Sequence, residues 1–233
     1  ASNIFDYRYA YDNTFYSEND ILELSTNLSN KYVTIEVPLK IRGGISIRQY
    51  QAKKGEPDYK HITANGKAVV PGTSFGGAIR SRTLAVAKEV LCESGLDSKS
   101  IASIMDYLFG FVAVKQKNTA HISRISFSES IIEGGSFLNI TRTAVSRFDN
   151  SVKNGALYSE KTHVGGELTL EIKVEKDVAA WAIPLILPAI LDLRNGYLPI
   201  GGLVSVGRGI FEENGAVLLK TTLQTIKHPL RRF

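Results

Sequence analysis

Nine residues near the C-terminus hold a dense set of glycines. Residues 201–209 read GGLVSVGRG, so four of the nine are glycine, and Arg208 lies among them. Glycine lets a backbone approach a ligand closely and turn several N–H groups in one direction, which suits a phosphate group. The spacing is neither that of a dinucleotide-binding fingerprint nor that of a Walker loop. The segment therefore indicates an anion site, and a bulged turn into the last strand is the alternative.

A second segment, residues 71–82, combines a proline-glycine turn with two arginines. It reads PGTSFGGAIRSR, and Thr73 or Ser74 can accept hydrogen bonds from free N–H groups at the start of a helix. The start of a helix also attracts anions through its dipole. Arg80 and Arg82 lie on the following turns, where they can pair with phosphates. An ordinary capped helix with two solvated arginines is the alternative.

The composition excludes several other kinds of site. A single cysteine, Cys92, excludes an internal disulfide framework and a cysteine-rich zinc site. The four histidines lie far apart, and no acidic pair has the spacing of a hydrolase. The 28 basic and 23 acidic residues give a net charge of +5, which permits a polyanionic partner without requiring one.

The longest apolar run, Val178–Leu191, contains two prolines and is too short to cross a membrane, so no membrane partner is expected. No signal peptide opens the chain, and a reduced, cytoplasmic setting is therefore expected.

Strands and helices must position these residues, and hydrophobic periodicity predicts where they lie. Strands are expected at Tyr32–Leu39, His121–Ile132, Phe137–Val145, Glu167–Val174 and Gly215–Thr222, and helices at Phe75–Leu91, Ser98–Phe109 and Asp177–Leu193. Glu167–Val174 alternates most clearly, with its aliphatic residues inward. No parallel alternation is long enough for a doubly wound sheet. We therefore expect an α+β fold with a ferredoxin-like or RRM-like antiparallel sheet and helices on one face.

The 233 residues are expected to form one domain with inserted loops at about 46–67 and 146–162. Residues 1–30 are rich in Asn, Ser, Asp and Tyr, which is typical of an irregular arm. Long loops inside a compact domain are usually functional or mobile. The loop at 46–67 is the more basic of the two, and it also contains Glu56 and Asp58.

Six segments, in order, resemble the RAMP superfamily of CRISPR-associated proteins, in particular the repeated backbone subunit of type III effector complexes. They are the turn at Gly43-Gly44, the helix start at 70–80, the Leu-Phe-Gly step at 108–110, the strand at 124–129, the thumb segment at 141–165 and the glycine loop at 201–209. Two positions depart from the family pattern. Gly76 stands where a lysine is common, which removes one phosphate contact, and Glu129 stands where an aspartate is usual.

The resemblance implies a subunit that binds guide RNA (crRNA) in a filament with other copies of itself and with other CRISPR effector subunits. Its thumb hairpin would splay the duplex of guide and complementary target RNA at intervals. The candidate RNA-binding residues are Arg42, Gly43, Gly44, Ser74, Arg80, Arg142, Arg147, Lys153, Gly202, Ser205, Gly207, Arg208 and Gly209.

The resemblance also implies a catalytic role for Asp58, because active members cut target RNA with an aspartate in the corresponding loop. A carboxylate there can hold a divalent metal ion such as Mg²⁺, or position a 2′-hydroxyl for attack on the adjacent phosphate. A solvated surface charge is the alternative for Asp58, and His61 is a second candidate for acid–base chemistry.

Two other functions remain open within the superfamily. The chain can be a structural crRNA-binding subunit without catalysis. It can also be an endoribonuclease that processes precursor crRNA, although such enzymes usually rely on an N-terminal histidine and no histidine precedes His61.

Overall fold

The computed structural model describes residues 31–50, 57–93, 95–111, 120–146, 148, 151–221 and 224–227. The arm expected at residues 1–30 lies outside this part of the chain. The first described strand, β1 (Tyr32–Arg42), is also the central strand of the main sheet. It pairs antiparallel with β11 (Glu167–Glu175) over nine consecutive residue pairs, from Tyr32 opposite Glu175 to Lys40 opposite Glu167.

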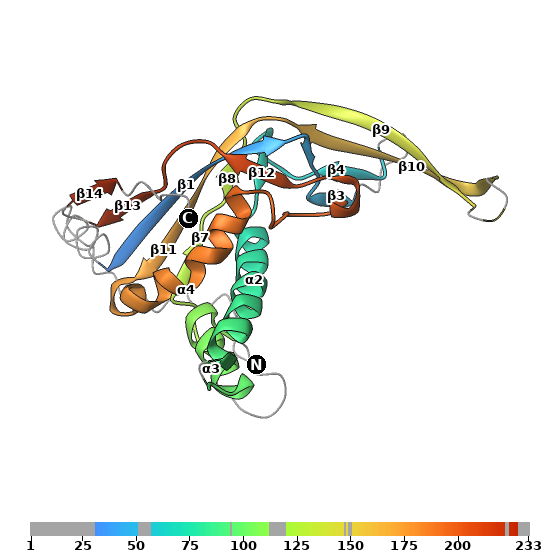
Figure 1. The fold of residues 1–233 in the computed structure, drawn as a ribbon. Coiled ribbons are helices and arrows are strands. Elements are labelled where there is room, and N and C mark those ends of the chain that lie inside the picture. Colours follow the sequence, from blue (N-terminus) through green and yellow to red (C-terminus); the bar gives the residue numbers. More distant parts are fainter. Residues whose placement is uncertain are drawn as a thin grey trace, which may run out of the picture.

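Shorter strands complete the main sheet on either side of this pair. β7 (Ile125–Phe127) lies beyond β11, whereas β12 (Ile210–Glu213), β13 (Leu218–Thr221) and β14 (Gln224–Lys227) lie on the β1 side. The long helices α2 (Gly72–Glu93) and α4 (Lys176–Arg194) lie on one side of the sheet, and α3 (Ser98–Phe109) packs against α2 (Figure 1).

This order of elements is a ferredoxin-like topology. Along the chain the main elements run β1, α2, β7, β11, α4 and then β12 and β13, while the spatial order of the strands is β13, β1, β11, β7. Two βαβ halves that interleave in one antiparallel sheet give this arrangement. The expected α+β fold with an antiparallel sheet and helices on one face is confirmed.

Strict alternation of apolar residues builds the core between the sheet and the helices. The buried side chains of the two central strands are Val33, Ile35, Val37, Leu39 and Ile41 of β1 and Leu168, Leu170, Ile172 and Val174 of β11. They pack against buried residues of α4, including Ile186 and Ile190. The inward face predicted for residues 167–174 is therefore confirmed.

A long hairpin extends from this core (Figure 1). Its strands, β9 (Ser136–Val145) and β10 (Val152–Val164), pair antiparallel, and β10 also pairs with β2 (Gly44–Ile45) and, in parallel, with β4 (Tyr59–His61). β3 (Arg48–Tyr50) pairs with β4. A third small sheet holds β5 (Thr63–Ala64), β6 (Lys67–Val70) and β8 (Ser130–Ile131).

Several expected boundaries were wrong. The segment 146–162, expected as a loop, belongs largely to β10, because the residues of this strand are mostly polar and show no hydrophobic alternation to detect. Part of the loop expected at 46–67 is likewise built into β3, β4 and β5. The strand expected at His121–Ile132 is two short strands, β7 and β8.

Helix α2 begins at Gly72 rather than at Phe75, so Thr73 and Ser74 lie in its first turn and do not cap it. α4 begins at Lys176 with Glu175 before it, so Asp177 is not its N-cap.

Within the described residues, no helix is both long enough and apolar enough to span a bilayer.

Candidate nucleic-acid interface

The loop at Gly201–Gly209 lies against the turn that follows β1. Gly209 donates its backbone N–H to the carbonyl of Gly44 at 2.8 Å, and Gly202 donates to Ser46, also at 2.8 Å. β2, which begins at Gly44, in turn pairs with the end of β10. Three segments far apart in the sequence, the Gly43-Gly44 turn, the base of the hairpin and the glycine loop, are therefore joined at one place.

At two of the glycines these segments approach so closely that an added side chain would displace a neighbour. Gly209 has φ of +70°, and a Cβ added there would lie 1.8 Å from the carbonyl oxygen of Ile200. A Cβ on Gly44 would lie 2.2 Å from Nη1 of Arg208. The guanidinium of Arg208 therefore rests directly over the Gly44 backbone, in space that any side chain at position 44 would occupy.

The chain itself uses many of the backbone N–H groups of the glycine loop. Val206 and Arg208 donate to the carbonyl of Leu203, and Gly207 donates to Val204, closing a short 3₁₀ turn at Val204–Val206. The N–H groups of Gly202 and Gly209 are bound to the β2 region, as described above. The anion-binding capacity of this loop therefore lies mainly in its side chains, above all in Arg208, with Ser205 exposed at the turn.

A buried carboxylate joins Arg208 to the hairpin. Glu160 of β10 has a side chain only 1% exposed, and its Oε1 lies 3.2 Å from Nη2 of Arg142 on β9 and 3.6 Å from Nη2 of Arg208. Nearby, the guanidinium of Arg48 on β3 stacks over the ring of Tyr59, 4.6 Å from its centroid. Tyr59 is the residue of β4 that pairs with Glu160. Two arginines thus meet one carboxylate, while Arg48 stacks on the residue that pairs with Glu160, and we call Arg48, Arg142, Arg208 and Glu160 the arginine cluster.

Asp58 lies one residue before β4, beside the base of the same hairpin. Its Oδ2 accepts a hydrogen bond from the backbone N–H of Ser159 at 2.7 Å, and the Ser159 hydroxyl lies 3.4 Å from the same oxygen. The residue is exposed, and within the described part of the chain Oδ1 has no hydrogen-bond partner. The carboxylate is thus held in place by one oxygen while the other is open to a ligand.

His61 is part of the core rather than a catalytic group. Its ring is fully buried; Nδ1 accepts from the N–H of Ile47, so Nε2 carries the proton and donates to the carbonyl of Val69, both at 3.1 Å. Burial, together with the neighbouring His163, lowers the pKa of His61 to about 4. The imidazole is therefore neutral near pH 7, with both nitrogens bonded to backbone groups.

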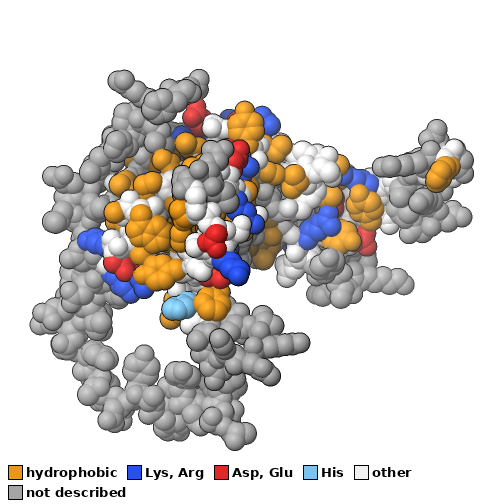
Figure 2. All heavy atoms as spheres, turned by 60° about the horizontal axis from the view of Figure 1, so that its bottom comes forward, with side chains coloured by type: hydrophobic (Ala, Val, Ile, Leu, Met, Phe, Trp, Pro, Cys, Tyr) orange, Lys and Arg blue, Asp and Glu red, His pale blue; other side chains and the backbone are white. Residues whose placement is uncertain are grey.

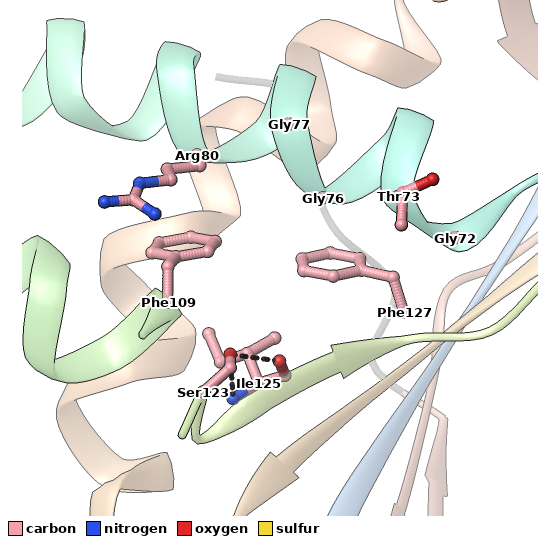
Figure 3. Close-up of a pocket in the computed structure, with 9 residues that line it drawn as sticks. All are labelled: Gly72, Thr73, Gly76, Gly77, Arg80, Phe109, Ser123, Ile125 and Phe127. Carbon is pink, nitrogen blue, oxygen red and sulfur yellow. Dashed lines mark hydrogen bonds between the residues drawn. The ribbon is translucent and has the colours of Figure 1, made fainter. Parts of the chain in front are cut away.

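The second glycine-rich segment serves another part of the molecule. Arg80 donates to the carbonyl of Gly110 at 3.1 Å and to Oδ1 of Asp106 at 2.8 Å, which ties α2 to the end of α3. Gly76 and Gly77 leave a cavity of about 310 Å³ beneath α2, where Phe109 and Phe127 lie side by side (Figure 3). Ser74 lies in the first turn of α2, where its N–H donates to Pro71.

The other described residues that were predicted to bind RNA lie in the hairpin or at the turn after β1. Arg42 is exposed at the end of β1, and the neighbouring Gly43, at φ of +74°, accepts from the N–H of Gly165. Lys153 lies in β10 near the far end of the hairpin, and Arg147 lies outside the described residues. Their roles in RNA binding stay predictions.

The open face of the main sheet does not carry a stacking surface. RRM domains bind RNA by stacking bases on aromatic side chains of the sheet. Here the central outward positions are occupied by Thr34, Glu36 and Pro38 of β1 and by Thr169, Glu171 and Lys173 of β11. None of these side chains is aromatic, and both glutamates are paired with lysines, so these positions offer no ring for stacking. The arginine cluster is therefore the better candidate for the RNA interface.

The described residues of this site offer a divalent cation one carboxylate, that of Asp58. Among the described residues, no group of three or more His, Cys, Asp or Glu side chains could hold a metal ion. Mg²⁺ is commonly bound by one or two carboxylates together with substrate phosphates. Asp58 offers one such carboxylate, so the donor set fits a cation held largely by RNA.

Sequence reasoning missed Glu160, Arg48 and Tyr59. Glu160 lies within the thumb segment that resembles the family, but no sequence motif relates it to the arginines that it contacts. Its two arginine partners are 18 and 48 residues away along the chain. Only the pairing of β10 with β9 and with the β2 region brings them together.

Comparison with known structures supports the fold. A chain of a type III-B Cmr-beta complex bound to cognate target RNA matches with a TM-score of 0.57 and 15% identity, over 87% of this chain and 66% of that chain. This protein thus spans just under two thirds of that neighbour's length. A chain of a CRISPR RNA-guided surveillance complex matches with a TM-score of 0.54 and 16% identity, over 81% of this chain and 68% of that one. A chain of apo type III-B Cmr-beta matches with a TM-score of 0.52 and 12% identity, over 81% of this chain and 98% of that chain.

At these identities the similarity establishes a shared fold. No curated protein gives a significant match to this chain. The family model of the RAMP superfamily matches residues 27–212, which is most of the chain. The chain belongs to the RAMP superfamily.

Proposed function

We propose that this protein is a crRNA-binding backbone subunit of a type III CRISPR effector complex, and that it cuts complementary target RNA through Asp58. One observation carries the proposal. The glycine loop, the Gly43-Gly44 turn and the base of the hairpin meet at the arginine cluster, beside an exposed carboxylate. Membership of the RAMP superfamily and the fold shared with chains of type III-B complexes support it.

The guide RNA would be held through its phosphates. Arginine is suited to this because its planar guanidinium binds phosphate oxygens in pairs. A net charge of only +5 suffices in a filament, since each copy has to hold only a short stretch of RNA. The hairpin β9–β10, which extends beyond the core (Figure 1), would separate the guide–target duplex at regular intervals.

Asp58 would act on the target strand at the base of this hairpin. Ser159 fixes one carboxylate oxygen, which leaves the other to orient a 2′-hydroxyl next to the scissile phosphate or to bind a divalent cation brought with the RNA. His61 has no part in this chemistry, because it is neutral and buried.

A second candidate is a structural crRNA-binding subunit without catalysis. A specific observation favours it: Oδ2 of Asp58 is already bonded to the hairpin, as expected of a residue that anchors β4 to β10. The two candidates share the RNA site and differ only in the role of Asp58.

The experiment uses the assembled, guide-loaded complex with labelled complementary RNA and Mg²⁺. Native protein is compared with Asp58→Ala and Asp58→Asn. The Asn variant keeps an oxygen that can accept from Ser159 and removes only the charge. Evenly spaced cuts that disappear in both variants, while target binding is retained, are the expected result.

Uncut target with the native protein would establish the structural subunit. Cuts that persist unchanged in both variants would place the chemistry elsewhere in the complex.

A further inference from the structure

We propose that Glu160 is a positioning residue for RNA binding: its buried carboxylate holds Arg142 and Arg208 side by side as one phosphate-binding pair. The inference rests on the proposed function, because it takes RNA phosphate as the ligand. Glu160 was not among the residues that the sequence singled out, and nothing in its neighbourhood along the chain points to it.

Burial of the Glu160 carboxylate is costly. Glu160 is 1% exposed, and a charge removed from water in this way is tolerated only when it is paired. Both arginines approach the same oxygen, Oε1, yet neither reaches hydrogen-bond geometry. Within the described residues, neither carboxylate oxygen of Glu160 has a hydrogen-bond partner. The carboxylate therefore attracts two guanidinium groups without saturating the donors of either.

Arg142 and Arg208 carry more positive charge than Glu160 neutralises. A closed structural ion pair balances its charges, whereas here two arginines meet one carboxylate, and Arg48 stacks nearby on Tyr59. The side chains of Arg142 and Arg208 remain 26% and 13% exposed, so each arginine is partly accessible from the protein surface. Each guanidinium has five N–H donors in a fixed plane. An incoming phosphate can supply the missing negative charge and accept from both.

The backbone segments that carry the two arginines are held in place by hydrogen bonds. Arg208 lies between two glycines with positive φ, in a loop bonded to Gly44 and Ser46, and its guanidinium rests over the Gly44 backbone. Arg142 lies in β9 opposite Tyr158 of β10. The backbones of both arginines are thus fixed, and Glu160 fixes their heads. Without its charge, the two guanidinium groups repel each other and separate.

The test is the affinity of the full chain for labelled single-stranded RNA at several salt concentrations, with native protein and E160Q. Removal of one negative charge makes the protein more basic, so general electrostatics alone predicts tighter binding. The proposal predicts the opposite, a roughly tenfold loss of affinity. The slope of log Kd against log salt is also expected to fall by about 0.7 for each phosphate that the protein no longer neutralises.

Three further variants complete the design. E89Q makes the same charge change at an exposed position of α2 and is expected to bind RNA as tightly as native protein, or slightly more so. E160D keeps the net charge but withdraws the carboxylate from both arginines, so it should lose affinity as E160Q does. It also serves as the test if E160Q does not fold. The double variant Arg142→Ala, Arg208→Ala tests the RNA site itself and should lose affinity whatever Glu160 does.

Equal or tighter binding by E160Q would overturn the proposal, as would weaker binding with an unchanged salt slope, which marks a purely structural role. If E160Q does not fold, native affinity in E160D overturns it. Native affinity in the double arginine variant would show that RNA is held elsewhere, so the RNA site proposed above would fail, and Glu160's role with it. Absence of RNA binding by native chain and assembled complex alike would overturn the proposed function as a whole.

Discussion

At the scale of single residues, the charge states of the buried residues His61 and Glu160 depend on the groups around them. His61 is neutral because it is buried and lies near His163, and its Nδ1 accepts a hydrogen bond from the backbone N–H of Ile47. Glu160 is tolerated because two arginines meet its carboxylate. Neither side chain is identifiable from its neighbours along the sequence, since all of these partners come from other elements.

The state of His61 predicts how stability depends on pH. The pKa of His61 is about 4 in the folded protein, against an ordinary value of 6.5. Between these values the unfolded chain binds more protons, so the free energy of unfolding falls as the pH is lowered from 6.5 towards 4. The loss attributable to His61 is about 3 kcal/mol, and no such loss occurs above pH 6.5.

Urea denaturation at pH 7 and near pH 4 measures this effect in native protein and in His61→Asn. The variant is expected to be less stable at pH 7 but less sensitive to acid. An acid sensitivity equal to that of native protein would contradict the assignment of a neutral, buried imidazole. Burial also lowers the pKa of His163, but that residue is unchanged in the comparison.

At the scale of elements, the glycine loop is held by close backbone contacts. Two of its glycines, Gly207 and Gly209, allow the cost of backbone strain to be distinguished from the cost of steric overlap. Gly207 and Gly209 have φ of +80° and +70°, so alanine is strained at both. At Gly207 no atom lies within 4 Å of an added Cβ, whereas at Gly209 the carbonyl oxygen of Ile200 would lie 1.8 Å away. Gly207→Ala is expected to lower the free energy of unfolding by about 1 kcal/mol. Gly209→Ala should lower it by more than about 3 kcal/mol, because the loop must detach.

Chemical denaturation of the two variants measures the difference. Similar losses at both positions would show that the loop does not pack against Ile200 as described. A larger loss for Gly209→Ala also carries a functional consequence, since the loop that detaches is the one that presents Arg208.

Elements governed by local signals were predictable from the sequence. α3 begins after Asp97, whose side chain accepts from the N–H of Ser100, and ends at Gly110 with φ of +75°, as expected for Ser98–Phe109. β1 and β11 were predictable because one face of each is buried and the other is not. β10 was not predictable, because its residues are mostly polar and show no hydrophobic period of two. The arginine cluster was not predictable from the sequence, because it depends on strand pairing between distant segments.

At the scale of the whole molecule, the helical side and the hairpin base differ in how their charges are paired. Figure 2 shows acidic, basic and hydrophobic side chains interspersed on the side where the helices lie. Arg124 there pairs with Glu175 and Asp177, and Arg82 pairs with Asp192. At the hairpin base, by contrast, two arginines meet one carboxylate. A polyanion is therefore expected to bind at the hairpin base and not on the helices.

Photocrosslinking tests this account most directly. Guide RNA carrying 4-thiouridine is assembled into the complex and irradiated, and the crosslinked peptides of this subunit are identified by mass spectrometry. We expect crosslinks in the peptides that contain Arg42–Arg48, Arg142 and Gly201–Arg208. Crosslinks confined to α3 and α4, around the exposed Tyr107 and Trp181, would contradict the account, because they would place the RNA on the helical side.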